Sequence, residues 1–481
     1  MQLKRLKPLS IVLFLYGFIC YLAVVVRSAQ ILRFPYTIDY GEATTLSQVK
    51  TLFSGLFPYS REAAEHLNYF SYTPLFQYIT SLIGQEPEAW LFTARLINTL
   101  ALVGVGLLLA KINCDWKEDK ATAWDFALPF LLWFSWFSVS NWMAMGRVDG
   151  LALFLQILGL FFYLKVTEKS SFKILSLVCF ILAFFTKQSA VWIPFTLMLW
   201  ETVRFQKKEL GRWSIYFAGV IGGLLILHYF SGGFVWDHLI KSNQNQFKLL
   251  NLTEMLMSNI EFHLGVLLVA VYGLVKMDLK KADALLLLLL ASSLIWVVGA
   301  GREGSSSNFL LELSVVLTLL VARGETYLNK SLLKSSIAAA VVLITCWPNM
   351  KVRSYFIKDP GPNIFWANYT NQAKEETDVV LKYIREAKGS IWSENPALPM
   401  FADKNTEFWP FEIGQSIARG EYSEDLLLQQ LKSKSIALIV RESAAHVVPV
   451  QRLSNNVLDL IETQYHIIYQ NEFYVVYGPN P

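Results

Sequence analysis

The sequence is poor in charge, in cysteine and in nucleotide-binding motifs, and each shortage excludes a class of protein. Charged residues make up 17% of the 481 residues, against roughly 25% in soluble domains, which excludes a chain that is water-exposed throughout. Only four cysteines occur and none forms a CxxC pair, so the sequence indicates neither a disulfide framework nor a zinc site. HExxH, P-loop and GxGxxG patterns are absent, which argues against zincin and nucleotide-driven chemistry.

Apolar residues, by contrast, make up 54% of the chain and come in long runs. From Leu9 to about Met350, charge is confined to short islands between these runs, and roughly 20 apolar residues are enough to cross the hydrocarbon of a bilayer. The pattern predicts a polytopic α-helical membrane protein with about eleven spans. These spans are Leu9–Val26, Ala89–Ile112, Trp124–Met145, Gly150–Val166, Phe172–Thr186, Ala190–Val203, Ser214–Phe230, Ile260–Val275, Ala284–Gly299, Phe309–Val321 and Leu333–Pro348.

Lysine and arginine concentrate in alternate connections between the predicted spans. The connections that are rich in them are residues 111–120, 165–173, 204–212, 276–281 and 323–334. They share a side with the basic N-terminal residues Lys4, Arg5 and Lys7, so the positive-inside rule places the N-terminus in the cytoplasm. An odd number of spans then places the chain after Met350 outside the inner or plasma membrane. The inside loops also account for the net charge of +4, so nothing indicates a nucleic-acid partner.

Beyond residue 350 the pattern changes to that of a small α/β domain. We therefore expect a transmembrane module over residues 1–350 and an extracytoplasmic domain over 351–481. The expected elements are helices at Ala373–Glu386, Asp425–Leu431 and Val457–Thr463, strands at Ile391-Trp392 and Ile436–Val440, and a hairpin of Tyr465–Tyr469 with Phe473–Tyr477 around Asn471-Glu472. The domain carries no recognisable catalytic motif, and a structural lid and an acceptor platform are both open as its role.

The segment after the first predicted span, residues 27–88, places two carboxylates where the chain leaves the membrane. Asp39 stands at the expected start of a helix that runs from Glu42 to about Phe53, and such an Asp can be an ordinary N-cap. An aromatic-rich stretch at residues 69–84 is too short to span and suits the membrane interface. We expect two juxtamembrane helices on the outer surface, with the acidic pair at the start of the first.

Several motifs follow one another along the predicted outer face. They are the Asp39–Glu42 element, Arg95-Leu96-Ile97-Asn98, Gly146-Arg147-Val148-Asp149-Gly150-Leu151, Phe185-Thr186-Lys187-Gln188-Ser189-Ala190 and Gly304-Ser305-Ser306-Ser307-Asn308-Phe309-Leu310-Leu311-Glu312. In this order and on this side, they resemble the glycosyltransferase C superfamily, most of all bacterial relatives of the lipid A aminoarabinose transferases and protein O-mannosyltransferases. The resemblance covers most of the chain. Two residues separate Asp39 from Glu42, whereas the mannosyltransferases have adjacent acids, and this departure weighs against Glu42 more than Asp39.

The resemblance implies an enzyme that moves a hexosyl or pentosyl group, with inversion, from a polyprenyl-phosphate donor to a hydroxyl of a glycan, lipid or protein on the extracytoplasmic face. A single displacement needs a carboxylate that takes the hydroxyl proton. The expected catalytic set is Asp39 as the base, Glu42, and Asp149, which would orient the acceptor or hold a metal. No cofactor is required, and the single phosphate of the donor permits a divalent metal without demanding one.

Negative charge that grows on the leaving phosphate calls for cations nearby. The expected phosphate ligands are Arg147, Lys187 and Arg302, with arginine able to bind in a bidentate manner. Each has a plainer alternative, because charges at span ends also reach into lipid headgroups or pair with one another, as Arg147 and Asp149 would. The rival class is a non-catalytic lipid-saccharide transporter or channel. A transporter should carry ionisable residues near mid-membrane, and the centres of the predicted helices have almost none.

Overall fold

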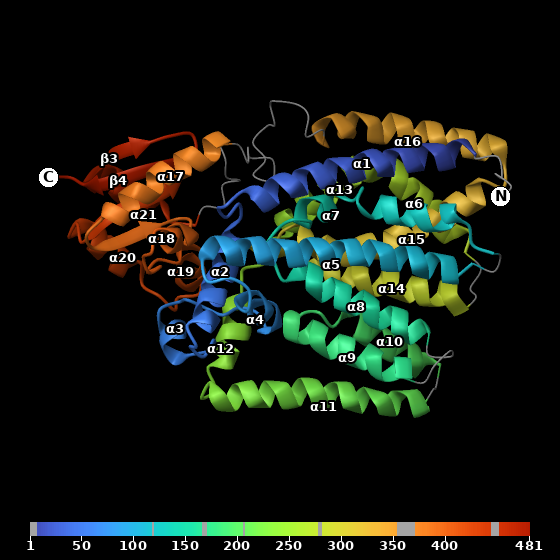
Figure 1. Cartoon of the computed structure of the whole chain (residues 1–481), viewed down its shortest axis with the longest axis horizontal. Helices are drawn as coiled ribbons and strands as arrows, with labels where there is room; N and C mark the ends of the chain where they lie inside the picture. Colours follow the sequence, from blue (N-terminus) through green and yellow to red (C-terminus); the bar gives the residue numbers. More distant parts are fainter. Residues whose placement is uncertain are drawn as a thin grey trace.

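The computed structural model describes residues 7–117, 120–165, 171–204, 207–277, 281–353, 371–443 and 452–481. For residues 207–210, 281–282 and 347–353 it describes the backbone alone. The basic residues Lys4 and Arg5 lie outside this range. Most helices run along the long axis of an elongated molecule, with the N-terminus at one end and a C-terminal α/β unit at the other (Figure 1).

In the described part of the chain before residue 354, the regular elements are all helices. Its helices are α1 (Pro8–Arg33), α2 (Tyr40–Phe53), α3 (Arg61–Glu65), α4 (Leu75–Ser81), α5 (Pro87–Asp115), α6 (Ala123–Trp133), α7 (Phe137–Trp142), α8 (Asp149–Leu164), α9 (Ser171–Thr186), α10 (Trp192–Val203), α11 (Lys207–Phe230), α12 (Val235–Leu239), α13 (Leu249–Val275), α14 (Lys281–Val297), α15 (Leu311–Leu328) and α16 (Leu332–Arg353), with 3-10 turns η1 (Lys241–Asn243), η2 (Val298–Gly301) and η3 (Ser307–Leu310). Every predicted span coincides with one of these helices, although the third is divided.

The divided span is the predicted helix Trp124–Met145, which breaks into α6 and α7 between residues 133 and 137. Neighbouring helices supply hydrogen-bond partners at the break: the Trp136 indole donates to Thr318 Oγ1 at 2.7 Å, and the Phe137 amide donates to His263 Nε2 at 3.0 Å. Irregular backbone at membrane depth is tolerated where protein satisfies it. Hydropathy alone cannot reveal such a break, because the residues on both sides of it are apolar.

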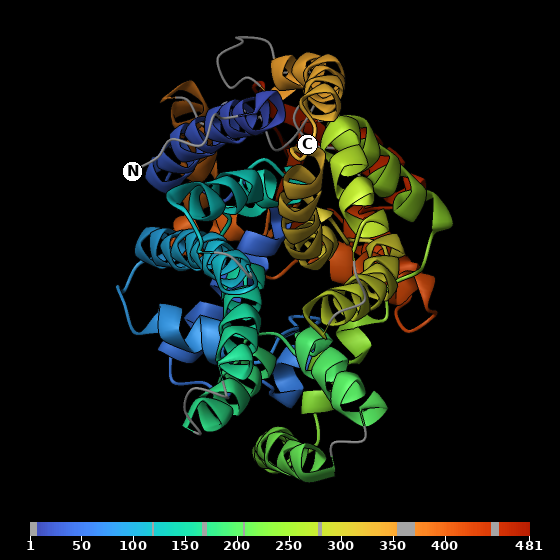
Figure 2. The same cartoon turned by 90° about the vertical axis from the view of Figure 1, so that its right-hand side faces the viewer.

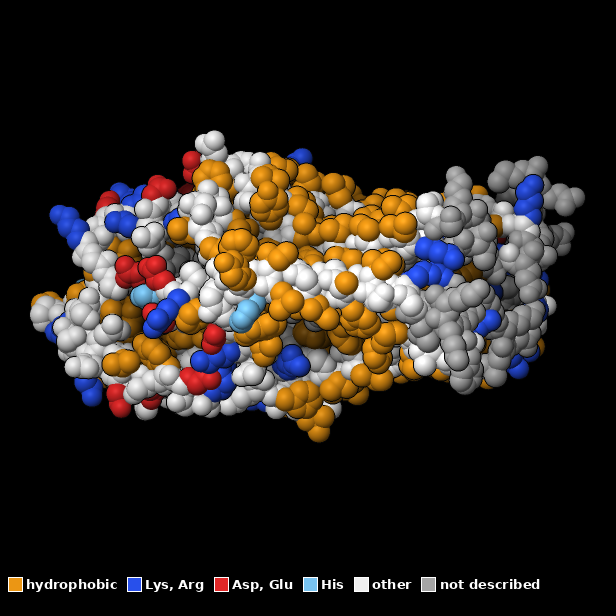
Figure 3. All heavy atoms as spheres, turned by 90° about the horizontal axis from the view of Figure 1, so that it is seen from below, with side chains coloured by type: hydrophobic (Ala, Val, Ile, Leu, Met, Phe, Trp, Pro, Cys, Tyr) orange, Lys and Arg blue, Asp and Glu red, His pale blue; other side chains and the backbone are white. Residues whose placement is uncertain are grey.

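Five described helices are long and apolar enough to cross a membrane by length and composition: α1, α5, residues 211–230 of α11, α13 and residues 283–301. The number of spans therefore remains a prediction. Large apolar side chains are exposed along several helices, among them Leu15, Ile221 and Ile295. Figure 3 shows hydrophobic side chains in a broad band across the middle of one face, between ends that carry charged residues. This surface is that of an integral membrane protein.

The bundle is built around aromatic residues. One core cluster joins Trp133, Trp136, Trp142 and Trp192 to aliphatic residues of most of the long helices. Helix α11 lies at the edge of the bundle, on the side opposite α1 and α16 (Figures 1 and 2). It packs against α9, α10 and α12, so most of its surface faces outward.

The C-terminal unit is a four-stranded sheet with helices around it. The strands are β1 (Ser390–Ser393), β2 (Ile436–Glu442), β3 (Tyr465–Gln470) and β4 (Tyr474–Pro479), in the order β1-β2-β4-β3, with only β1 and β2 parallel. The helices are α17 (Asn371–Glu386), α18 (Ala397–Phe401), α19 (Pro410–Ala418), α20 (Glu424–Lys432) and α21 (Asn455–Gln464). The predicted strands and helices coincide with these elements, whereas the short helices α18 and α19 were not predicted.

The C-terminal unit packs on the end of the helical bundle at which α2 begins. Tyr36, Ala43 and Leu46 share one apolar cluster with residues of α17, α18 and the sheet. Helix α19 contacts α2 and the segment before α15, because Glu412 accepts a hydrogen bond from Tyr40 and Gln415 donates to Glu303 at 2.7 Å. Helices α18 and α19 therefore stand directly beside α2, the helix that Asp39 caps.

Candidate functional site

Asp39 closes the elbow between α1 and α2. Its Oδ2 atom accepts hydrogen bonds from the Gly41 amide at 2.9 Å and from Arg147 Nη1 at 2.8 Å. The side chain is 26% exposed, and no hydrogen bond reaches Oδ1 from the residues that the structure describes. The expected N-cap is therefore present on one oxygen, and the other oxygen keeps its lone pairs.

Arg147 reaches Asp39 through space that only a glycine leaves open. A Cβ atom on Gly41 would lie 1.0 Å from Arg147 Nη1, so any larger residue there would displace the guanidinium. Arg147 Nη2 also donates to the Tyr72 hydroxyl at 3.2 Å, and the guanidinium lies over the Trp142 ring. Its Nε atom is buried without an acceptor in hydrogen-bond range among the described residues. One donor of a buried arginine thus remains unused.

Asp149 is the first residue of α8, and donors surround it on every side. Its Oδ1 atom accepts from Lys187 Nζ at 2.7 Å and from Asn308 Nδ2 at 2.9 Å, and its Oδ2 atom accepts from the Trp142 indole at 2.9 Å. Arg147 Nε lies 4.0 Å from Oδ2, which is an ion pair and not a hydrogen bond. Asp149 therefore links Arg147, in the connection before α8, to Lys187 and Asn308 in two other connections.

Lys187 lies in the turn between α9 and α10 and is largely buried. Burial alone would lower the pKa of its ammonium group, but the Asp149 carboxylate more than offsets this effect and the pKa lies above its usual value. The ammonium also lies 5.3 Å from the centre of the Phe309 ring. Lys187 therefore stays charged at every physiological pH.

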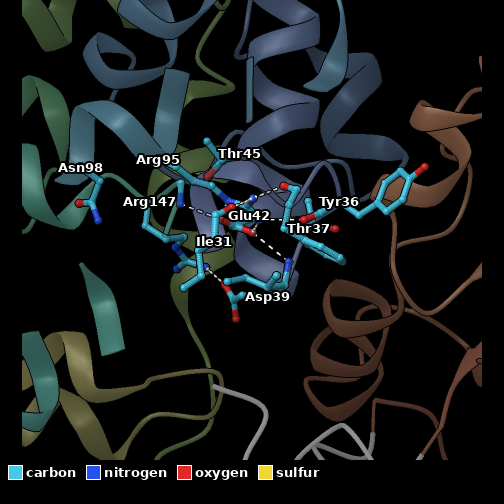
Figure 4. Close-up of polar contacts among 12 residues, drawn as sticks. Ile31, Tyr36, Thr37, Asp39, Glu42, Thr45, Arg95, Asn98 and Arg147 are labelled. Atoms are coloured by element: carbon cyan, nitrogen blue, oxygen red, sulfur yellow. Dashed lines mark hydrogen bonds and ion pairs between the residues drawn. The ribbon is translucent and has the colours of Figure 1, made fainter. Parts of the chain in front are cut away.

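Glu42 has a different environment from Asp39, as Figure 4 shows. Glu42 and Arg95 are both fully buried and form a bidentate pair with two distances of 2.8 Å. The carboxylate also accepts from the amides of Gly146 at 2.7 Å and Ile38 at 2.9 Å. With four donors around it, Glu42 fixes the elbow and the Arg147 turn beneath the site.

Helix α5 holds the α1–α2 connection and the α7–α8 connection together through two residues that are three apart. Arg95 donates to the carbonyls of Ile31, Phe34 and Tyr36, at 2.6 to 2.8 Å. Asn98 donates to the carbonyl of Trp142 at 2.6 Å and accepts from the Gly150 amide at 2.8 Å. Both side chains are fully buried. They are positioning residues, because they set where Asp39, Arg147 and Asp149 stand.

The structure brings four of the six candidate residues into one network, Asp39–Arg147 and Asp149–Lys187, with Glu42 buried below it. Arg302 is separate from these contacts. Its side chain is exposed and takes part in no hydrogen bond or ion pair given for the described residues, while its backbone forms an isolated bridge with Phe247. A role for Arg302 stays a prediction.

Four contributors escaped prediction: Tyr72, Trp142, Asn308 and the positioning role of Arg95. A signal for the last was present, because an arginine and an asparagine three residues apart inside an apolar helix must find buried partners. Within the described chain, no three His, Cys, Asp or Glu side chains gather as a metal site would require. Both Asp149 oxygens face cations or N–H donors, which is a poor environment for a metal ion.

Comparison with known proteins gives the fold a counterpart. No protein-family model and no curated protein match the chain. The structure is similar to ArnT from Cupriavidus metallidurans in the apo state, with a TM-score of 0.62 and 12% identity over 97% of this chain and 98% of that chain. It is also similar to that ArnT bound to undecaprenyl phosphate, with a TM-score of 0.59, 11% identity and the same coverage. ArnT is a lipid A aminoarabinose transferase of the glycosyltransferase C fold, so the predicted resemblance is confirmed at the level of fold.

Proposed function

We propose that the chain is a membrane glycosyltransferase that moves a sugar from a polyprenyl-phosphate donor to an acceptor hydroxyl on the extracytoplasmic face. The observation that carries the proposal is Asp39, whose Oδ1 atom is unengaged among the described residues while its Oδ2 atom is fixed by Arg147 and the Gly41 amide. A general base needs a held carboxylate with a lone pair to spare. The fold shared with ArnT, one of whose structures contains undecaprenyl phosphate, supports the class of donor.

The chemistry that we propose is one displacement with inversion. The acceptor oxygen forms a bond to the anomeric carbon while the bond from that carbon to the phosphate oxygen breaks. The hydroxyl proton passes to Oδ1 of Asp39, and the electron pair of the broken bond stays on the phosphate. Arg147 and Lys187 offset the charge that grows there, and the unused Nε donor of Arg147 is available to a phosphate oxygen.

The other candidate residues receive separate roles. Asp149, already bonded to Lys187, Asn308 and Trp142, holds the cations in place, and we prefer this role to metal binding. Glu42 positions the elbow together with Arg95. Arg302 is exposed near the outer ends of α13 and α15, where it would attract the anionic donor without a fixed contact. Its replacement by alanine should change the rate of donor capture more than the rate of transfer.

The orientation in the membrane is part of the proposal. Connections rich in Lys and Arg alternate along the chain with connections that are not, and the C-terminal unit falls on the side of the second kind. The positive-inside rule places the Lys- and Arg-rich connections in the cytoplasm. The candidate site and the sheet then face outward, where a lipid-linked donor is the available sugar source. The proposed domain boundary near residue 350 falls within α16. Residues 354–370, which follow α16, lie outside the described chain.

One experiment separates this proposal from a lipid-saccharide transporter. Purified protein in detergent is mixed with labelled undecaprenyl-phosphate mannose, glucose or arabinose and with an envelope glycolipid extract, and the products are identified by mass spectrometry. An enzyme yields a new glycosidic bond and free undecaprenyl phosphate. A transporter leaves every covalent bond unchanged in detergent, and that outcome with all three donors would reject the proposal.

A further inference from the structure

A small cavity lies beneath the Asp149–Lys187 pair, between α8, the turn after α9 and the start of α15. Its polar lining comes from Asp149, Gln156, Lys187, Ser189, Asn308 and Glu312. The enclosed part has room for about one water-sized group, since one such group needs roughly 10–15 Å³ of probe-centre volume. It therefore fits one hydroxyl of a larger molecule that stands at its mouth.

Glu312 is the carboxylate of this lining that receives no side-chain hydrogen bond from the Asp149–Lys187 network. Its Oε2 atom is shielded from solvent and accepts no hydrogen bond from any described residue. A position in the first turn of α15 gives a carboxylate a favourable helix dipole. The nearby Lys187 charge and the dipole both favour a carboxylate here. Neither gives Oε2 a hydrogen bond, although buried polar atoms are nearly always bonded.

Three of the other polar residues of the cavity have partners of their own. Lys187 donates to Asp149, Asn308 donates to Asp149, and Gln156 Oε1 accepts from the Ile193 amide at 3.1 Å. A ligand group that enters here therefore meets Glu312 Oε2, a buried acceptor without a hydrogen bond from the described residues. The complementary group is a donor of hydroxyl size, next to the cations assigned to the phosphate.

From this geometry we propose that Glu312 accepts a hydrogen bond from one hydroxyl of the donor sugar and thereby selects which sugar is transferred. The inference rests on the proposed function and extends it, because it places one hydroxyl of the donor sugar in the cavity between Gln156 and Glu312. Binding would satisfy an acceptor that is empty in the free protein. A sugar without that hydroxyl would leave a buried carboxylate unpaired, and such mismatches discriminate strongly.

The test compares Glu312→Gln with wild type, and Glu325→Gln, at the cytoplasmic end of the same helix, serves as the matched control. Affinities are measured in detergent for bare undecaprenyl phosphate and for its mannose, glucose and arabinose forms. We expect wild type to bind one sugar form more tightly than the bare lipid. Glu312→Gln should weaken that form about tenfold or more, while bare lipid binds within about twofold of wild type.

Stability gives an independent readout. Because the free Glu312 oxygen has no partner to lose, Glu312→Gln should melt at the wild-type temperature or above it, which a structural carboxylate would not do. The inference is overturned if wild type shows no preference for any sugar form, if Glu312→Gln keeps the preference, or if it lowers the melting temperature. Wild type could also prefer one sugar form and yet transfer no sugar. That result would count against the proposed reaction and would leave the assignment of Glu312 to sugar binding in place.

Discussion

Replacement of Glu42 by glutamine should damage the fold before it damages the chemistry. Each carboxylate oxygen accepts two hydrogen bonds, one from Arg95 and one from a backbone amide. The amide is that of Gly146 at Oε1 and that of Ile38 at Oε2. In Glu42→Gln an amide nitrogen meets two of these donors, and the buried Arg95 charge loses its counterion. Breaking such a pair from one side costs about 3–5 kcal/mol.

The assay is thermal unfolding in detergent with transfer measured on the folded fraction. The control is Glu65→Gln, which removes the partner of Arg61 in an exposed pair and should not shift the melting temperature. The double variant Glu42→Gln/Arg95→Met removes both charges and should recover part of the loss. A Glu42→Gln protein that melts like wild type yet transfers no sugar would refute this reasoning and make Glu42 a catalytic residue.

Three further predictions concern donor binding, topology and pH. Lys187→Ala should weaken undecaprenyl phosphate binding by about 1.5–3 kcal/mol, the value of a hydrogen bond to a charged group; unchanged affinity would remove Lys187 from the site. A cysteine at Ser171 should resist an impermeant thiol reagent in intact cells and one at Ser390 should react; the opposite pattern would invert the topology. Desolvation raises the pKa of Glu412 to about 7 despite the hydrogen bond from Tyr40, so stability should fall as pH rises from about 4.3 through 7. In thermal melts, Glu412→Gln should flatten that dependence, and an unchanged slope would show that other groups cause it.

The sequence predicted the helices well because hydrophobic length is a local property. Each predicted span coincides with a helix, and the hairpin around Asn471 coincides with β3 and β4. It could not predict the break in the span Trp124–Met145, because His263 and Thr318, more than a hundred residues away, stabilise the break. The five-residue helix α3 and the short α18 and α19 were missed for a related reason, since tertiary contacts and not periodicity stabilise such short elements.

The candidate site was predicted from residue types and from the side of the membrane to which each connection was assigned. The sequence could not predict which acidic residue pairs with which basic residue. Asp39, Arg147, Asp149 and Lys187 were predicted to converge on one face together with Arg302, and the structure brings the first four together without Arg302. The pairing depends on the space that Gly41 leaves for the Arg147 guanidinium and on the shape of the turn before α8. Neither can be read from the spacing of residues in the sequence. The Arg147–Asp149 ion pair, the plainer alternative to phosphate binding, is present only as a long contact of 4.0 Å to Oδ2. The Trp142 indole donates to that oxygen and Lys187 donates to Oδ1.

The central claim is that Asp39 accepts the hydroxyl proton, and Asp39→Asn tests it most directly. Asparagine caps a helix about as well as aspartate, so the Gly41 contact survives, and the melting temperature should stay within a few degrees of wild type. Asp149→Asn is the companion variant and should show a milder loss, because its role is to hold Lys187.

The measurement is single-turnover transfer from a labelled undecaprenyl-phosphate sugar in detergent, with donor affinity determined on the same preparation. The account predicts that Asp39→Asn binds donor normally and transfers sugar roughly 10²–10⁴-fold more slowly, the usual contribution of a general base. Transfer at a near-normal rate by folded, donor-bound Asp39→Asn would contradict it and reduce Asp39 to a helix cap.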